Sequence, residues 1–305
     1  MKFKKYQHIE KLGREECEGL LNVDAVYCFP KIDGTNSCLF LGEADTLQAG
    51  SRRCLLNDEQ DNGGFYAWSK TQPQYLEYLK VHPNHILYGE FMIPHTIKSY
   101  DDAVWGNLYI FDVFEVDEKG MNSRYLSYEE YKPLLEEFNI VYIPCLAIKD
   151  HPSIEEIAEL AKHNHYLMPD GSKAIGEGIV CKSYNYKNKW GRTIWGKFVA
   201  EEFFNKKQHL RSKNHDAKSN FEMKIAQEYI TDSVIYKEYA KIKNEFLNAS
   251  KNEMIGRVLN TVYETFLNED LLTVVRKNKK CTINFQNLKK QSDNRVKEVL
   301  RDELF

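Results

Sequence analysis

A single polar stretch divides this chain into two parts with different residue patterns. Residues 205–220 read NKKQHLRSKNHDAKSN and contain almost no apolar side chain, which is typical of a linker. A length of 305 residues favours about two domains. We therefore expect one domain over residues 1–205, a linker over 206–218 and a second domain over 219–305.

The first part has the pattern of short strands separated by turns, with a few helices. Its strand-like runs, rich in β-branched and aromatic residues, cover 25–29, 37–41, 85–91, 107–114, 178–182 and 192–198. Ser127 with Glu130, and Ser153 with Glu156, have capping-box spacing and predict the starts of two surface helices. The pattern as a whole predicts an α+β domain.

The second part changes to a helical period. Met254, Val258, Val262 and Phe266 recur every four residues, as the buried face of a helix requires. Similar spacing is found from Phe221 onward and again near the end of the chain. These runs predict a small all-α C-terminal domain.

Charge differs between the two parts. Residues 1–202 carry a formal charge of −9 and residues 203–305 a charge of +6, which together give the overall −3. A basic second domain favours an anionic partner. The alternative is two solvated surfaces of different sign.

Composition excludes several classes of protein. No run approaches the 18 consecutive apolar residues of a membrane span, and the start, MKFKKYQHIEK, lacks the apolar region of a secretory signal. The seven cysteines contain no C-x-x-C pair, so neither a disulfide framework nor a common zinc site is expected. We expect a cytoplasmic protein without membrane contact.

One short motif points to chemistry. The run KIDGTN, Lys31 to Asn36, lies between two predicted strands. A lysine becomes a nucleophile when its surroundings lower its pKa, and Gly34 permits a tight turn or a close ligand approach. Asn36 can hydrogen-bond a sugar hydroxyl. By itself the motif is weak, because a hairpin turn with an exposed lysine has the same sequence.

Five further motifs follow in a fixed order. They are Arg52, Tyr88-Gly89-Glu90, Ile110-Phe111-Asp112-Val113, the run from Gly176 to Lys182, and Gly196-Lys197-Phe198. With the lysine loop, this ordered set resembles motifs I, Ia, III, IIIa, IV and V of the covalent nucleotidyltransferases, the polynucleotide ligases and mRNA capping enzymes. That resemblance implies a nucleotidyltransferase domain built from antiparallel sheets.

Within that superfamily the chain most resembles the ATP-dependent nick-sealing RNA ligases, typified by the double-strand RNA ligase of T-even phages. The opening Phe3-Lys4-Lys5-Tyr6 and the pair Thr35-Asn36 carry this likeness, together with Gly89-Glu90-Phe91 and Tyr109 to Asp112. The likeness extends over roughly residues 1–205. The helical part matches only in its size, position and helical character.

The resemblance implies a role for each motif. Lys31 would attack the α-phosphorus of ATP, releasing pyrophosphate and leaving a lysyl-AMP. Glu177, with Asp33 as a possible helper, would hold Mg²⁺ or Mn²⁺. The residues expected to bind ATP and AMP are Pro30, Lys31, Ile32, Asn36, Arg52, Glu90, Phe111, Lys182 and Lys197.

Some of these assignments have rivals. Arg53 competes with Arg52 for the phosphate or sugar contact. Phe111 would stack on adenine, although an aromatic residue in an apolar strand is more often part of the core, and Tyr109 is the alternative.

Two residues depart from the family pattern. Asp33 stands where the nick-sealing ligases have histidine, which leaves the metal's protein partners open. The family's last motif is usually Lys-x-Lys, but here Trp195 takes the first position and only Lys197 remains. Either Lys197 acts alone or Lys189 or Arg192 compensates.

The resemblance also implies the partner and the later steps. AMP would pass to an RNA 5′-phosphate, and a 3′-hydroxyl would then displace it. The expected substrate is a nicked RNA duplex, and the expected enzyme is a monomer that acts in RNA repair. The basic helical domain would contact the RNA backbone, and the candidate residues are Arg276, Lys277, Lys279 and Lys280.

Other functions are less consistent with the sequence. An ATP-dependent DNA ligase or a guanylyltransferase would carry a β-barrel after the last motif, where this chain is predicted to be helical. A non-catalytic nucleic-acid-binding relative is supported only by the missing lysine at position 195.

Overall fold

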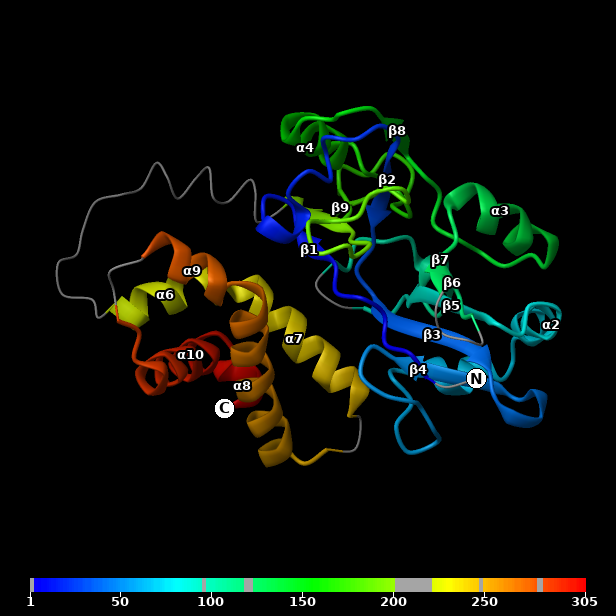
Figure 1. Cartoon of the computed structure of the whole chain (residues 1–305). Helices are drawn as coiled ribbons and strands as arrows, with labels where there is room; N and C mark the ends of the chain where they lie inside the picture. Colours follow the sequence, from blue (N-terminus) through cyan, green and yellow to red (C-terminus); the bar gives the residue numbers. More distant parts are fainter. Residues whose placement is uncertain (1–2, 95–96, 118–122, 201–220, 247–248, 279–281) are drawn as a thin grey trace. The chain divides into compact units, whose positions relative to one another are not determined.

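The protein is described here from a computed structural model covering residues 3–94, 97–117, 123–200, 221–246, 249–278 and 282–305. The chain divides into two compact units, Met1–Ser212 and Lys213–Phe305. Figure 1 shows mixed strands and helices in the first unit and helices alone in the second. The predicted linker, residues 206–218, lies outside the described residues.

Two five-stranded sheets form the framework of the first unit. The first sheet has the order β1-β10-β9-β2-β8, and all of its pairs except β1–β10 are antiparallel. Its strands are β1 (Glu10–Lys11), β2 (Val26–Lys31), β8 (Ala147–Lys149), β9 (Gly178–Lys182) and β10 (Gly196–Val199).

The second sheet is wholly antiparallel, with the order β4-β3-β5-β6-β7. Its strands are β3 (Thr35–Leu41), β4 (Leu47–Ser51), β5 (His85–Phe91), β6 (Leu108–Glu115) and β7 (Arg124–Tyr125). The expected α+β class with antiparallel sheets is therefore confirmed.

The described part of this unit includes the helices α1 (Phe65–Ser69), α2 (Pro73–Val81), α3 (Tyr128–Glu137) and α4 (Ile154–Lys162). Short 3₁₀ turns occur at Glu15–Cys17, Glu43–Asp45 and Asp102–Val104. Both predicted capping boxes are present, since Ser127 and Ser153 each accept from the backbone N–H three residues ahead.

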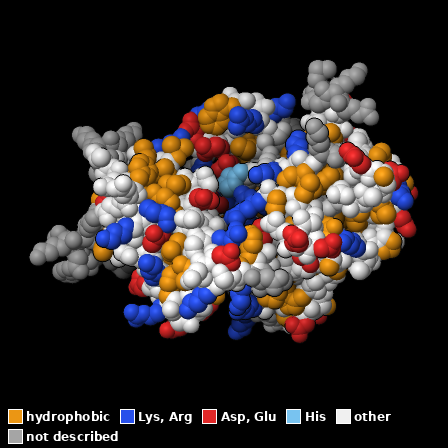
Figure 2. Space-filling view, turned by 90° about the horizontal axis from the view of Figure 1, so that it is seen from below, with side chains coloured by type: hydrophobic (Ala, Val, Ile, Leu, Met, Phe, Trp, Pro, Cys, Tyr) orange, Lys and Arg blue, Asp and Glu red, His pale blue; other side chains and the backbone are white. Residues whose placement is uncertain are grey.

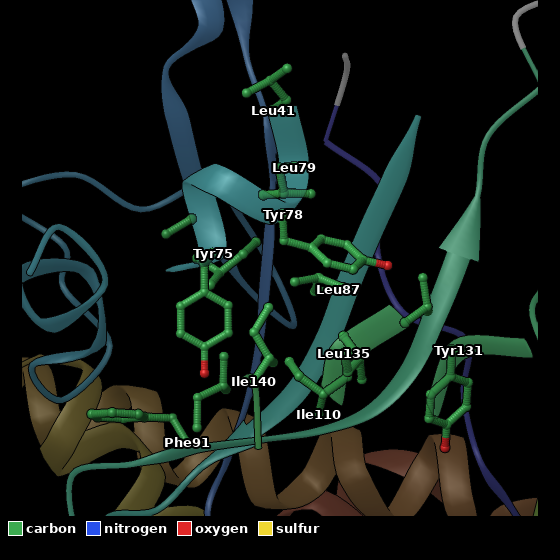
Figure 3. Close-up of a cluster of buried hydrophobic side chains, with 14 of the residues drawn as sticks. Leu41, Tyr75, Tyr78, Leu79, Leu87, Phe91, Ile110, Tyr131, Leu135 and Ile140 are labelled. Atoms are coloured by element: carbon green, nitrogen blue, oxygen red, sulfur yellow. The ribbon is translucent and has the colours of Figure 1, made fainter. Parts of the chain in front are cut away.

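Several apolar clusters hold this unit together, and three of them define its layers. On one face of the second sheet, Leu87, Phe91 and Ile110 pack against side chains of α2 and α3, and Figure 3 shows them pointing toward one another. On the outer face of the first sheet, residues such as Cys28 and Ile179 pack against α4. A third cluster lies between the sheets. It contains Tyr6, Cys38, Phe40, Ile86, Tyr88, Phe114, Val180 and Trp195.

One predicted strand is shorter than expected. Residues 192–198 were expected to be extended, but β10 begins only at Gly196. The difference arises because Asn188 organises the preceding residues into a turn, in which its carboxamide accepts from the backbone N–H of Arg192.

The second unit is a set of helices around one apolar core. The helices are α6 (Phe221–Tyr229), α7 (Asp232–Glu245), α8 (Lys251–Glu269), α9 (Leu271–Lys277), α10 (Phe285–Val299) and α11 (Arg301–Leu304). Met254, Val258, Val262 and Phe266 are all buried in that core, as their spacing predicted. The Glu222 carboxylate joins α6 to the start of α10 by accepting from the Asn284 N–H at 2.9 Å.

Two further observations concern predictions made from composition. The six cysteines within the described residues are free thiols, and Cys281 lies outside them. Across the described ranges, none of the helices is both long enough and apolar enough to span a bilayer.

Candidate active site

Lys31 is the last residue of β2, and its ammonium is directed at Glu177. Its Nζ lies 2.5 Å from Glu177 Oε2, and both side chains are largely buried, with exposed fractions of 17% and 12%. Glu177 stands immediately before β9, where Gly178 pairs with Lys31. The strand pairing therefore places a lysine and a carboxylate side by side.

Strand register places two more lysines on the same face of the first sheet. Lys31 pairs with Gly178, and Tyr27, four residues earlier on the same face, pairs with Lys182. On the other side of β9, Lys197 pairs with Val180. Val180 and Lys182 are two residues apart on the same strand, so their side chains lie on the same face. Lys31, Lys182 and Lys197 therefore share the face that packs toward the second sheet.

A polar row on the second sheet adjoins the nucleophile loop. Asn36 pairs with Glu90, and Glu90 pairs with Tyr109 across β3, β5 and β6. The Gly34 N–H donates to Glu90 Oε1 at 3.1 Å, which connects this row to the loop after Lys31. A side chain at Gly34 has no room, because a Cβ there would lie 2.5 Å from the Phe91 carbonyl oxygen.

Asp33 is buried and hydrogen-bonded to a segment that no motif had identified. Its Oδ2 accepts from the Ile97 N–H at 3.0 Å, and its own N–H donates to the Tyr100 hydroxyl at 3.0 Å. Burial and the negative charges of Asp33, Glu177 and Glu90 raise the pKa of Tyr100. Tyr100 was not among the predicted site residues, since an isolated tyrosine between two motifs gives no signal.

Phe111 lies at a β-bulge. Tyr88 pairs with Asp112 and Gly89 with Ile110, so Phe111 is the extra residue on β6. Its carbonyl oxygen accepts from Lys182 Nζ at 2.6 Å. The half-buried Phe111 ring lies 4.9 Å from the Tyr6 ring. The bulge thus presents one carbonyl to Lys182 and one ring to the space between the sheets.

Lys182 is held in a buried polar network instead of lying open to a ligand. Its Nζ lies 2.8 Å from Asp112 Oδ1, with 2% and 0% of the two side chains exposed. The Tyr6 hydroxyl donates to the other oxygen of Asp112. Burial raises the pKa of Asp112 and lowers the pKa of Lys182, while their mutual attraction opposes both shifts.

Trp195, which occupies the position of the missing lysine, is a core residue. Its side chain is fully buried between the sheets, with its ring 5.4 Å from Tyr184 and 5.6 Å from Tyr125. The two residues considered as compensating cations lie elsewhere. Lys189 is paired with Glu15, and Arg192 is exposed in the turn before β10.

The remaining predicted ATP contacts are distributed around this arrangement. Pro30 is buried and, as the neighbour of Lys31 on β2, faces the opposite side of the sheet. Ile32 is buried against Phe29 and Met92. Arg52 is exposed after β4, where its Nη2 lies 2.8 Å from Nδ1 of His8, and its rival Arg53 is also exposed.

A divalent cation is compatible with Glu177. No three His, Cys, Asp or Glu side chains are grouped as metal ligands within the described ranges. Mg²⁺ commonly uses one or two carboxylates and completes its shell with water and substrate phosphates. The Glu177 carboxylate, which accepts the Lys31 ammonium in this structure, has the required oxygen chemistry.

The candidate RNA contacts lie in the second unit. Arg276 and Lys277 end α9, and Arg276 is exposed. Lys277 Nζ donates to the Tyr229 hydroxyl at 2.9 Å, which raises the pKa of Lys277. Lys279 and Lys280 lie outside the described residues. On the surface shown in Figure 2, basic side chains alternate with acidic and hydrophobic ones.

The first unit thus combines two largely antiparallel sheets with a lysine at the end of β2 that contacts a carboxylate. A comparison with protein families matches residues 24–199 to the family described as RNA ligase. The chain therefore belongs to the RNA ligase family. No curated protein matches it.

Solved structures show the same fold. An RNA ligase variant from Naegleria gruberi without ligand has a TM-score of 0.51 and 19% identity, covering 67% of this chain and 57% of its own. A second variant, with ATP and manganese, has a TM-score of 0.50, 19% identity and coverages of 66% and 57%. A third variant, with AMP and manganese, has a TM-score of 0.51 and 18% identity, covering 67% of this chain and 58% of its own. This chain thus spans less than two thirds of the length of those neighbours.

Proposed function

We propose that this protein is an ATP-dependent RNA ligase that uses Lys31 as its covalent nucleophile. The observation that carries the proposal is the Lys31–Glu177 contact at 2.5 Å, placed by the pairing of β2 with β9. A surface hairpin lysine would not be mostly buried against a carboxylate. The family match and the neighbours with ATP, AMP and manganese support the same reading.

In the first step, Lys31 Nζ forms a bond to the α-phosphorus of ATP and the bond to the pyrophosphate oxygen breaks. Attack requires the neutral amine, so the ammonium must first lose a proton. Glu177 Oε2 already accepts a hydrogen bond from Nζ and is a proton acceptor within reach. A bound Mg²⁺ or Mn²⁺ would neutralise phosphate charge beside Glu177.

The AMP moiety would occupy the space next to Lys31 between the sheets. Asn36 and Glu90 lie side by side and would hydrogen-bond the ribose hydroxyls, and Phe111 would stack on the adenine. Lys197, on the same sheet face as Lys31, would neutralise the α-phosphate. The backbone at Pro30 and Ile32 flanks the nucleophile, and Arg52 would approach from the end of β4.

Lys182 would assist in a different way. Its ammonium is already engaged by Asp112 and the Phe111 carbonyl, so it would support the adenine-stacking residue. In this arrangement Lys182 acts on AMP through Phe111, and Lys197 supplies the phosphate cation.

The later steps would transfer AMP to an RNA 5′-phosphate and join that end to a 3′-hydroxyl with release of AMP. The Thr35-Asn36 pair favours RNA over DNA as the polymer. We infer the nick-sealing subfamily from the wider likeness of the opening Phe3 to Tyr6 and of the loop from Lys31 to Asn36. That subfamily would act on a nicked duplex in RNA repair, as a monomeric cytoplasmic enzyme. The helical second unit, with Arg276 and Lys277 at the end of α9, would contact the RNA backbone.

A DNA ligase remains the second candidate for the activity. Against it, helices α6 to α11 occupy the region where that class carries a β-barrel. A non-catalytic relative would be favoured by Trp195 alone, whereas the Lys31–Glu177 contact argues for a working site.

Intact mass after incubation with ATP and Mg²⁺ tests the proposal. Wild type should gain the mass of one AMP, and Lys31→Ala should not. Lys162→Ala, at an exposed lysine of α4 that no motif includes, is the control and should label like wild type. Absence of an adduct on wild type with ATP would refute the adenylylation step.

Substrate class requires a second measurement. Adenylylated protein should seal a nick whose 3′-hydroxyl strand is RNA faster than the same nick with a DNA 3′ strand. Equal rates, or a preference for DNA, would favour the DNA ligase alternative.

A further inference from the structure

The turn between β9 and β10 presents an exposed tryptophan. Trp190 is 53% exposed, while Trp195 is fully buried and Trp68 and Trp105 are half-buried. Leaving an indole in water forgoes the large gain from burying its apolar surface. An exposed tryptophan is therefore informative when its surroundings also hold it in place.

Hydrogen bonds make the turn rigid. The Asn188 carboxamide oxygen accepts from the N–H groups of Trp190 and Arg192, each at 3.1 Å. The Asn188 N–H donates to the Arg192 carbonyl at 2.9 Å, and the Gly191 N–H donates to the Asn188 carbonyl at 2.8 Å. Gly191 has a φ of +73°, which glycine adopts without strain.

The turn is also fixed to the body of the first unit. The Tyr186 hydroxyl donates to the Glu18 carbonyl at 2.5 Å, and Lys189 is paired with Glu15. Lys189 Nζ lies 4.8 Å from the centre of the Trp190 ring. The indole is thus held in one position, with a lysine at one side and much of its surface in water.

Two further cations belong to the same turn. Lys187 and Arg192 are both exposed, and neither makes an ion pair within the described part of the chain. The acidic residues at the base of the turn include Glu15, whose charge is matched by Lys189. The turn therefore combines an open aromatic surface with two positive charges available for an anion.

We propose that the turn Lys187–Arg192 is an RNA-contact site, in which an unpaired base stacks on Trp190 while Lys187 and Arg192 contact neighbouring phosphates. Every base offers a π-face, and stacking on an aromatic side chain contributes about 1–3 kcal/mol per base. Phosphate contacts by lysine and arginine add affinity that falls with salt. A protein partner would not require this pairing of an open ring with two free cations.

The inference deepens the proposed function, on which it rests for the identity of the polymer. The turn joins the strands that carry Lys182 and Lys197, so RNA bound there would be attached to the framework of the site. It also narrows the substrate, because stacking on Trp190 needs a base that is unpaired or at an end.

The test is fluorescence titration of the full-length protein with a 12-nucleotide single-stranded RNA. Trp190 is the one exposed tryptophan of the four, so we expect its emission to be quenched. Affinity is measured separately from the anisotropy of a fluorescein label on the RNA. Trp190→Ala should weaken binding about 5- to 160-fold, from the stacking contribution given above. Trp190→Phe should lose most of the quenching but keep affinity within about threefold, because a stacking ring remains.

Salt dependence tests the cations. Lys187→Ala and Arg192→Ala should each reduce the slope of log K against log salt by about 0.7, the value for one phosphate contact to a single strand. The control is Val81→Ala, which removes another exposed apolar side chain and should change neither affinity nor slope.

Several results would overturn the inference. They are unchanged affinity in Trp190→Ala, unchanged slopes in both cation variants, and no binding of RNA by wild type. The AMP adduct is measured on the same samples. Trp190→Ala should still form the AMP adduct at the wild-type level. Absence of the adduct in wild type would refute the ligase proposal. Weaker RNA binding by Trp190→Ala with a normal adduct tests this site alone.

Discussion

The ammonium of Lys182 lies 2.8 Å from the Asp112 carboxylate and is almost completely buried. The same ammonium donates to the carbonyl of Phe111, the extra residue of the β6 bulge. One ion pair therefore connects the two sheets and fixes the local backbone of an aromatic residue expected to contact the nucleotide.

Breaking this pair from one side should be costly. Lys182→Met leaves the Asp112 carboxylate buried without its cation, and we expect a loss of about 3–5 kcal/mol in unfolding free energy. Asp112→Asn should have a similar effect for the opposite reason. The double variant should lose clearly less than the sum of the two. Urea unfolding followed by tryptophan fluorescence reports on this unit, since all four tryptophans lie in it.

Lys149 and Glu156 provide a matched control. Their side chains are 3.4 Å apart but 34% and 52% exposed. Solvent screening reduces such a pair to about 0–1 kcal/mol, so Lys149→Met should have little effect. Additive losses in the Lys182 and Asp112 double variant would contradict a coupled pair.

Acid should destabilise the first unit through His85. Burial, then the charges of His82 and Arg124, lower the pKa of His85 to about 4. The neutral ring lies 2.8 Å from the Tyr78 hydroxyl. Because the folded pKa is depressed below the usual value near 6.5, this contribution is present above pH 6.5. It is lost as the pH falls toward 4, since the unfolded chain takes up the proton first.

His85→Gln isolates that contribution. The lowered pKa of His85 limits its pH-dependent contribution to the unfolding free energy to about 3 kcal/mol. Solvent screening reduces that contribution to about 1–2 kcal/mol. Unfolding free energy measured at pH 7 and pH 4.5 should fall less for His85→Gln than for wild type by that amount.

Local sequence patterns predicted much of this structure for identifiable reasons. The capping boxes at Ser127 and Ser153 and the four-residue period from Met254 to Phe266 depend only on neighbouring residues, and the structure has them. The motif order placed Lys31 and Glu177 in the same site although 146 residues separate them. Their contact follows from β2–β9 pairing, which no local pattern encodes.

Other features depended on tertiary contacts that the sequence does not display. Asp33 is buried because Ile97 and Tyr100 fold back over it, and nothing local marks that segment. Lys182 has the sequence context of a phosphate contact, yet its partner is Asp112 on the other sheet. The turn at Asn188 shortened a predicted strand because a carboxamide captured the backbone N–H groups.

Position Gly34 should not accommodate even one added methyl group. In Gly34→Ala the Cβ would meet the Phe91 carbonyl at 2.5 Å, and the loop after Lys31 would have to move. We expect the rate of AMP adduct formation to fall at least about tenfold, because displacement near the nucleophile disturbs attack geometry.

A glycine-to-alanine substitution in the second unit should instead be tolerated and should increase stability. A Cβ at Gly256, within α8, meets nothing within 4 Å. Gly256→Ala should stabilise that helix by about 0.5–1 kcal/mol, measured by circular dichroism during thermal unfolding, and should leave adduct formation unchanged. A wild-type rate in Gly34→Ala would contradict the close packing at the nucleophile loop.

Restoring the family's missing lysine at position 195 should harm this protein instead of improving it. Trp195 is fully buried between the sheets, and Lys182 Nζ lies 5.7 Å from its ring. Trp195→Lys would leave a cavity and bring a second cation toward a buried ammonium. We expect a loss of about 3–5 kcal/mol in unfolding free energy. Adduct formation should not increase at a temperature where the variant remains folded.

Trp195→Phe, which keeps an aromatic ring, should lose less stability and retain activity. A stable Trp195→Lys variant with faster adenylylation would show that the position can still serve as a phosphate cation, and that packing between the sheets has not replaced that role.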